Sequence, residues 1–75
     1  MKRAQVTEYI LIFKDDTELS KQYDGEYISE NINDTDDIFD KYTDQISQYY
    51  SKRWILDGDD LKWKEDYVDI YYREA

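Results

Sequence analysis

The sequence predicts an α+β fold, a small antiparallel β-sheet with one amphipathic helix packed on one face. Three observations predict it. Residues 5–13 form a β-branched and aromatic run, residues 33–52 repeat apolar side chains at helical spacing, and residues 53–73 alternate around an Asp-Gly turn. Alternation is typical of strands, and spacings of three and four are typical of helices. The expected order of elements is β(β)αβββ, within a single domain spanning residues 1–75.

The first strand is predicted over residues 5–13, because this run is rich in the residue types that favour strands. Its alternating side chains divide into Val6, Ile10 and Ile12 on one face and Tyr9, Leu11 and Phe13 on the other. A polar stretch follows and ends at Asp24-Gly25, a dipeptide typical of turns. Residues 26–32 alternate and are interpreted as a short second strand, antiparallel to the first.

The helix is predicted over residues 33–52, where apolar side chains recur at spacings of four, four and three, at Ile38, Tyr42, Ile46 and Tyr49. Asp34 is the expected N-cap, and Asp37 can help to satisfy the unpaired amides of the first turn. Lys52 and Arg53 lie at the other end, where the helix dipole favours cations. The start and stop signals therefore agree with the periodicity.

Residues 53–63 predict a hairpin, in which residues 54–56 and 61–63 flank a turn at Asp57-Gly58. Residues 67–73 alternate and predict a last strand. In that strand the apolar set is expected to point inward and the other set outward, with Val68, Ile70 and Tyr72 opposed to Asp69, Tyr71 and Arg73.

The composition argues against most catalytic chemistry. The chain has no cysteine and no histidine, so the usual zinc ligands and the usual neutral-pH base are both missing. No phosphate-binding glycine motif is present. The acidic run at residues 57–60 is interpreted as a solvated turn rather than a metal site. We therefore expect a non-enzymatic protein without cofactor or metal and, because no apolar run reaches about 20 residues, a cytoplasmic one that does not enter the membrane.

Negative charge is concentrated in one part of the chain. The net charge is −9, and residues 15–44 carry eleven acids against only Lys21 and Lys41. The net charge of that segment therefore equals the net charge of the whole chain. Such a balance opposes direct binding to nucleic acid or to an anionic membrane and favours a basic partner.

The predicted helix would arrange part of this charge in a row. Asp36, Asp40 and Asp44 are spaced i, i+4 and i+8, with Asp37 beside them, so they should lie on the face away from the apolar stripe. We interpret this row as a partner-binding surface. Its expected extension includes neighbouring acids and two tyrosines that would act as exposed aromatic anchors, namely Glu30, Asp34, Asp15, Asp16, Glu26, Tyr23 and Tyr27.

In length, acidity, tyrosine content and lack of cysteine and proline, the chain resembles the small acidic inhibitors of bacteriophages and mobile elements. These include anti-CRISPR proteins, anti-restriction proteins and uracil-DNA glycosylase inhibitors. The resemblance implies a DNA mimic that occupies the nucleic-acid-binding cleft of a basic host enzyme, such as a CRISPR nuclease. It transfers no individual functional residue to this sequence.

A second hypothesis explains the acidity by solubility alone. In this interpretation the chain is a small adaptor or structural domain that associates through a sheet edge or through the Trp54/Trp63 hairpin. Apolar association of that kind would respond weakly to salt, whereas binding by a DNA mimic would weaken steeply as salt rises.

Overall fold

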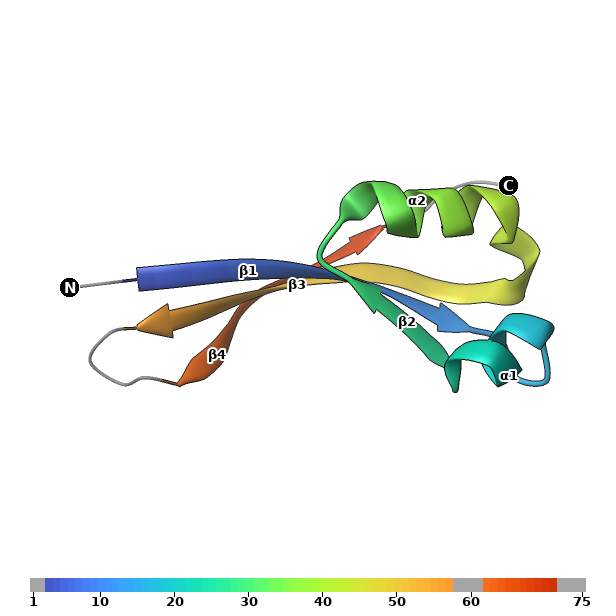
Figure 1. Ribbon diagram of the computed structural model, residues 1–75, viewed down its shortest axis with the longest axis horizontal. Helices are drawn as coiled ribbons and strands as arrows, with labels where there is room; N and C mark the ends of the chain where they lie inside the picture. The colour runs from blue at the N-terminus through green and yellow to red at the C-terminus, as the bar shows by residue number, and fades with distance from the viewer. Residues whose placement is uncertain (1–2, 58–61, 72–75) are drawn as a thin grey trace.

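The computed structural model describes residues 3–57 and 62–71. Four strands form one antiparallel sheet in the order β2-β1-β3-β4, and they are β1 (Arg3–Phe13), β2 (Glu26–Ser29), β3 (Ile46–Asp57) and β4 (Trp63–Tyr71) (Figure 1). Between the strands lie three helical segments, α1 (Glu18–Tyr23), α2 (Ile32–Lys41) and the 3-10 turn η1 (Thr43–Gln45). The predicted α+β fold class is confirmed, with a short second helix in addition to the expected one.

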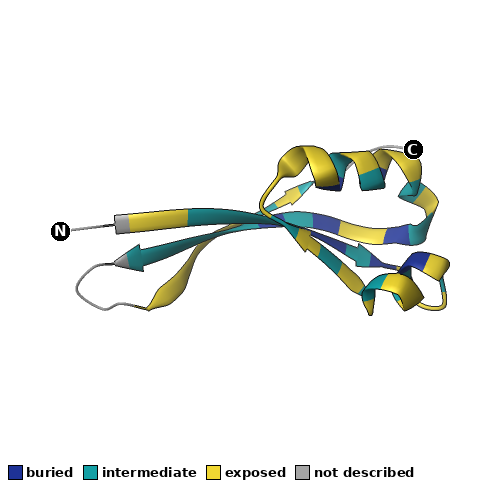
Figure 2. Ribbon diagram, viewed as in Figure 1, coloured by how far each residue is buried: buried dark blue, intermediate teal, exposed yellow. Residues whose placement is uncertain are grey.

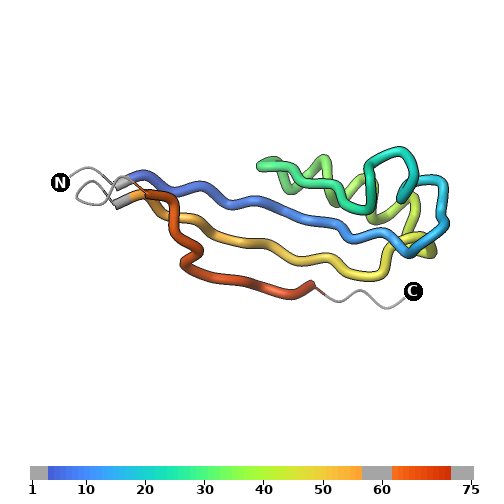
Figure 3. The backbone as a smooth tube through the Cα atoms, turned by 90° about the horizontal axis from the view of Figure 1, so that it is seen from below, coloured from blue at the N-terminus to red at the C-terminus, as the bar shows by residue number. Residues whose placement is uncertain are grey.

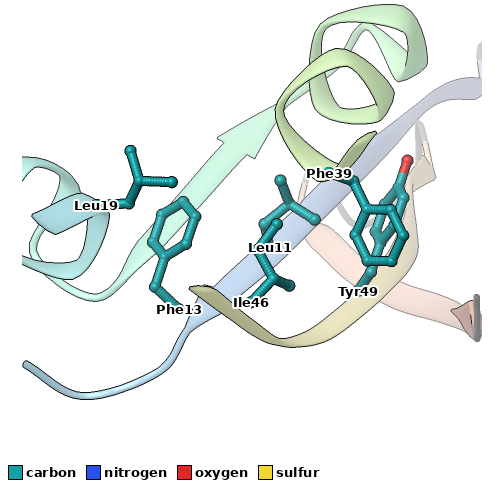
Figure 4. Packing of buried hydrophobic residues seen from close by; sticks show 6 residues of the cluster. All are labelled: Leu11, Phe13, Leu19, Phe39, Ile46 and Tyr49. Carbon is teal, nitrogen blue, oxygen red and sulfur yellow. The ribbon is translucent and has the colours of Figure 1, made fainter. Parts of the chain in front are cut away.

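A row of side chains across all four strands forms the centre of the core. Leu11 on β1 is paired with Tyr27 on β2 and with Tyr49 on β3, which is paired in turn with Tyr71 on β4. Leu11 is fully buried, and Phe39 of α2 packs on Tyr49 with ring centres 5.1 Å apart (Figure 4). Leu19 of α1 belongs to the same buried cluster as Phe39 of α2, so both helices pack on this side of the sheet, which we call the helix face.

The opposite side of the sheet, the open face, carries a second apolar row. Ile10 is paired with Ile28 and with Tyr50, and Tyr50 with Ile70. Ile10 is buried by these neighbours, whereas Ile28 and Ile70 are 47% and 46% exposed. The division of β1 into two apolar faces is therefore confirmed. Only one of those faces is covered by helices.

The molecule is long and thin, measuring 44 × 24 × 16 Å. Both helices lie over one half of the sheet, and beyond them β1, β3 and β4 continue side by side (Figures 1 and 3). We call this second part, residues 4–8, 52–56 and 63–68, the uncovered half. None of its residues is buried, and the buried residues gather in the helical half instead (Figure 2).

Helix α1 was not anticipated from the sequence. Thr17 caps it, because its side chain accepts a hydrogen bond from the amide of Ser20, and Leu19 anchors it in the core. Asp24 and Gly25 have left-handed backbones, with φ of 56° and 95°, and the Gly25 amide donates to the Ser20 carbonyl. The dipeptide is thus a turn, as predicted, but it ends a helix instead of joining two strands directly.

The helix predicted over residues 33–52 is too long at its C-terminal end. Helix α2 stops at Lys41, and Ile46 and Tyr49 belong to β3, where they pair with β1. Their spacing of three fits a helix, but residues 46–57 gain more by completing the sheet on the free side of β1. The N-cap is Asn31, whose side chain accepts from the Asn33 amide, rather than the predicted Asp34.

Of the two strands expected over residues 61–63 and 67–73, Trp63 and residues 67–71 belong to the single strand β4, which pairs with β3 through an irregularity next to Arg53. Leu61 lies outside the described residues. The predicted facing of β4 is wrong. Tyr71 packs against the core, while Val68 and Ile70 point to the open face and are 39% and 46% exposed. The helices cover the face of the sheet on which Tyr71 lies. The alternating apolar residues of β4, Val68 and Ile70, therefore lie on the open face. Gly58, Tyr72 and Arg73 lie outside the described residues.

The core row predicts a strongly uneven response to truncation. Leu11→Ala should lower the free energy of unfolding by about 3 kcal/mol, because it removes a fully buried side chain and leaves a cavity. Ile70→Ala on the open face should cost about 1 kcal/mol or less, since that side chain is already half in water. Urea denaturation followed by circular dichroism measures both. Equal losses in the two variants would contradict the assignment of the core to the helix face.

Candidate functional site

The strongest candidate site is the acidic half, which we define as residues 15–44. It comprises the turn after β1, then α1, β2, α2 and most of η1, all on the helical half of the molecule (Figure 1). Its eleven acids and two bases contrast with five acids and six bases in the other described residues. The fold therefore converts a local excess in the sequence into an electrically polarised molecule.

Most acids of this half are exposed. Of the predicted site residues, eight carboxylates face solvent, those of Asp15, Asp16, Glu26, Glu30, Asp34, Asp37, Asp40 and Asp44. Among the described residues, and leaving Asp40 aside, no acid of this half forms an ion pair with a lysine or arginine. The ion pairs Lys52–Glu65, at 3.3 Å, and Arg53–Asp66, at 2.6 Å, lie in the uncovered half.

Asp36 does not belong to the exposed set, and the predicted row of three aspartates is not formed. The Tyr49 hydroxyl donates a hydrogen bond of 2.7 Å to Asp36 Oδ1, so this carboxylate points to the sheet. Asp44 lies in η1, after the end of α2, and so leaves the helical i+8 position. The prediction of this row was wrong because it required a helix that continues past Lys41. The exposed acids instead come from several elements.

Tyr23 and Tyr27 are not the exposed anchors that the sequence predicted. The Tyr23 ring stacks on Phe13 at 5.7 Å and meets the Tyr27 ring edge-on at 5.2 Å, and both tyrosines are half-buried beside the core. Both rings are half-buried because α1 places Tyr23 beside Phe13 at the end of β1 and beside Tyr27 of β2. These rings hold the acidic half together.

Sequence reasoning omitted two acids of this half, Glu18 and Asp24, both exposed. The signal for α1 was available, since Thr17 is a favoured N-cap and Leu19 and Tyr23 are four residues apart. Asp16 and Asp24 also have left-handed backbones, with φ of 64° and 56°, which aspartate tolerates better than most residues. Their presence therefore has a conformational explanation in addition to charge.

Tyr49 links the core to the acidic half. Its hydroxyl donates to Asp36 and lies 3.3 Å from the Thr35 hydroxyl. Burial, as the largest cause, raises the pKa of Tyr49 from 10.0 to about 12, with a further increase from the Asp36 carboxylate and an opposing effect of the Thr35 hydrogen bond. The folded protein thus keeps this phenol protonated at a pH where an unfolded chain ionises it.

This shift predicts a specific loss of stability in alkali. Between pH 10 and 12 the unfolded chain releases the Tyr49 proton and the folded chain retains it, so the free energy of unfolding falls as pH rises. At about 1.4 kcal/mol per pKa unit, the fall between pH 8 and pH 11 is on the order of 1 kcal/mol. Tyr49→Phe should remove it, at a cost of about 1 kcal/mol near pH 8 from the lost hydrogen bonds.

Urea denaturation at pH 8, 10 and 11 measures this effect. Tyr50→Phe is the matched control, because Tyr50 is the next residue of β3 and points to the opposite face. It should retain the alkaline loss of the parent chain. An alkaline loss that persists unchanged in Tyr49→Phe would contradict the role of the Tyr49 phenol.

No group of three or more His, Cys, Asp or Glu in the described ranges 3–57 and 62–71 could hold a metal ion. Neither is any helix in those ranges long and apolar enough to span a bilayer. The predicted turn at residues 57–60 lies largely outside the described residues.

Comparison of the chain with protein-family models, with curated proteins and with solved structures found no match.

Proposed function

We propose that this chain is an acidic inhibitor that binds the nucleic-acid-binding cleft of a host enzyme in place of DNA. One observation carries the proposal. The residues responsible for the entire net charge of −9 fold onto one half of the molecule, and their carboxylates, Asp40 aside, form no ion pair with a lysine or arginine among the described residues. A chain that needed acidity only for solubility would benefit equally from charges spread over its whole surface.

The amount of charge suits the role. Duplex DNA carries one negative charge per about 1.7 Å of axis, so nine net charges correspond to roughly 15 Å of duplex. The acidic half presents this charge on a body whose two shorter dimensions are 24 and 16 Å. Its charge density is therefore of the order that a groove lined with lysine and arginine has evolved to accept.

Binding would proceed through electrostatic steering followed by steric exclusion. The acidic half would attract a cationic cleft over several ångströms and displace the counterions held there. Once seated, the packed core behind the carboxylates would prevent them from rearranging. The bound inhibitor would then block nucleic acid without any chemical step, and neither a cofactor nor a metal enters this mechanism.

The class of partner follows from this chemistry. It is a basic nucleic-acid-binding protein, and the resemblance to phage and mobile-element inhibitors suggests a CRISPR nuclease or another DNA-processing defence enzyme. Such a target lies in the bacterial cytoplasm, which is where the inhibitor would act. The inhibitor itself would bind no nucleic acid, because its charge has the same sign.

A second candidate function is an adaptor that associates through the sheet. The open face and the edge strand β4 favour it, since Val68 and Ile70 are partly exposed and Trp63 is 51% exposed. Exposed apolar groups that adjoin one another often mark interaction surfaces. This candidate differs from the first in the surface it uses and in its response to salt.

Charge reversal on the acidic half should abolish partner binding. Asp37→Lys, Asp40→Lys and Asp44→Lys alter three exposed side chains and leave the Asp36–Tyr49 hydrogen bond intact. The triple variant should lose about tenfold or more in affinity for a partner recovered from bacterial lysate and displaced by duplex DNA. Binding should also fall steeply as salt rises, because paired charges are screened.

The matched control makes the same change in net charge elsewhere, with Glu65→Lys, Asp66→Lys and Asp69→Lys, all on β4 and outside the acidic half. It should retain most of the affinity. If both triple variants bind as the parent does, or if the partner cannot be displaced by DNA, the DNA-mimic proposal fails. Salt-insensitive binding that Val68→Asp removes would favour the adaptor.

A further inference from the structure

The open face carries a groove of about 530 Å³ that is lined by Val6, Glu8, Glu30, Trp54 and Trp63. Three strands and the segment after β2 build it. Val6 on β1 is paired with Trp54 on β3. Trp63 on β4 is paired with Leu56, which lies two residues after Trp54 on β3. Ser29 is paired with Tyr9, so Glu30 comes next to Glu8. The register thus brings two tryptophans and two carboxylates to one concave site within the size range of ligand sites.

Neither carboxylate of the groove is neutralised within the described residues. Glu8 and Glu30 form no ion pair there. Lys52 is paired with Glu8 in the β1–β3 register, but its ammonium group lies 3.3 Å from Glu65 on the other side, toward β4. The groove therefore combines two carboxylates that form no ion pair with a partly apolar lining, which is favourable for an incoming cation and unfavourable for an anion.

The aromatic lining is also suited to a cation. The Lys52 ammonium lies 5.7 Å from the centre of the Trp54 ring, so a cation of the chain itself already uses a face of this ring. Tryptophan has the most favourable ring face for such contacts. Trp63, from the neighbouring strand, is 51% exposed and therefore available to an external group.

We propose that this groove binds a cationic side chain, an arginine, presented by a protein partner. A guanidinium is planar, stacks on indole rings and can donate paired hydrogen bonds to carboxylates, whereas an ammonium group makes point contacts only. Both kinds of acceptor are present here, with two rings and two carboxylates around one site. The occupant would insert its aliphatic stem along Val6 and place its charged end between Glu8 and Glu30.

This inference goes beyond the DNA-mimic proposal, because it concerns the open face and needs no nucleic-acid cleft. Glu30 belongs to both surfaces, but the tests change different residues, so the two proposals fail independently. Reversal of Asp37, Asp40 and Asp44 tests the first, and none of these residues lines the groove.

The test uses the two tryptophans as reporters, since the chain has no others. In ¹H–¹⁵N spectra of the whole chain, the indole signals of Trp54 and Trp63 are followed during titration with N-acetyl-arginine methylamide. Both signals should shift and saturate, with a dissociation constant in the millimolar range that suits a single side chain. The citrulline analogue has the same shape without charge, and it should produce shifts at least about tenfold smaller at equal concentration.

Variants test the carboxylates. Glu8→Gln with Glu30→Gln should weaken binding of the arginine probe about fivefold or more, because both charge-assisted contacts are removed. Asp37→Asn with Asp44→Asn removes the same charge away from the groove and should change the affinity by about twofold at most in 0.15 M salt. The remaining amide spectrum confirms that each variant is folded.

Three outcomes would overturn the proposal. The first is an equal response to arginine and citrulline analogues, which would indicate apolar contact only. The second is an equal loss of affinity in the two double variants, which would indicate attraction by net charge alone. The third is a concentration-dependent oligomer in which the tryptophan signals respond to dilution but not to the probe, which would assign the groove to a second copy of this chain.

Discussion

The burial of Leu11 between the sheet and the helices is the packing interaction on which the rest of the structure depends. Both helices pack on the row that Leu11 forms with Tyr27, Tyr49 and Tyr71, and Phe39 of α2 belongs to the same core cluster. The same region carries the exposed acids, whose mutual repulsion opposes compaction. Each close like-charge pair on a helix costs a few tenths of a kcal/mol, whereas burying one large apolar side chain gains about 1.5–3 kcal/mol. A small core can therefore hold a strongly charged surface in a fixed shape.

Charge is treated differently in the two halves of the molecule. In the uncovered half, Lys52 and Arg53 each pair with an acid of β4, and Arg53 also lies over the Tyr67 ring. Exposed pairs of this kind add little stability, but they cancel the local field. In the acidic half, such pairing is almost absent among the described residues. The negative electrostatic potential is therefore strongest around the acidic half. Such an uneven potential can orient the molecule as it approaches a cationic surface.

The open face is the second consequence of the single-sided architecture. A sheet with helices on only one face exposes the apolar side chains that alternate to the other, and the chain has no further element among its described residues to cover them. Ile10 is buried by its own neighbours, but Ile28, Val68 and Ile70 remain partly in water. The molecule thus presents an acidic surface and a separate aromatic and apolar surface.

Some features could be predicted from the sequence because they depend on neighbouring residues alone. The alternation of β1, the α+β class and the concentration of acids in residues 15–44 all belong to this group. The row through Asp36, Asp40 and Asp44 could not be predicted reliably, because it depended on where the helix ends. Ile46 and Tyr49 fit helical spacing as well as strand pairing, and only the free side of β1 decides between them. The same holds for Tyr23 and Tyr27, whose burial depends on α1.

The sequence by itself determined the amount of charge, its position along the chain and the absence of histidine and cysteine, because these are properties of composition and order. The tertiary structure alone decided which face of β4 is covered, which aspartate turns toward Tyr49, and that Glu8, Glu30, Trp54 and Trp63 meet in one groove. These features arise from contacts between strands far apart in the chain, and local periodicity carries no information about such contacts.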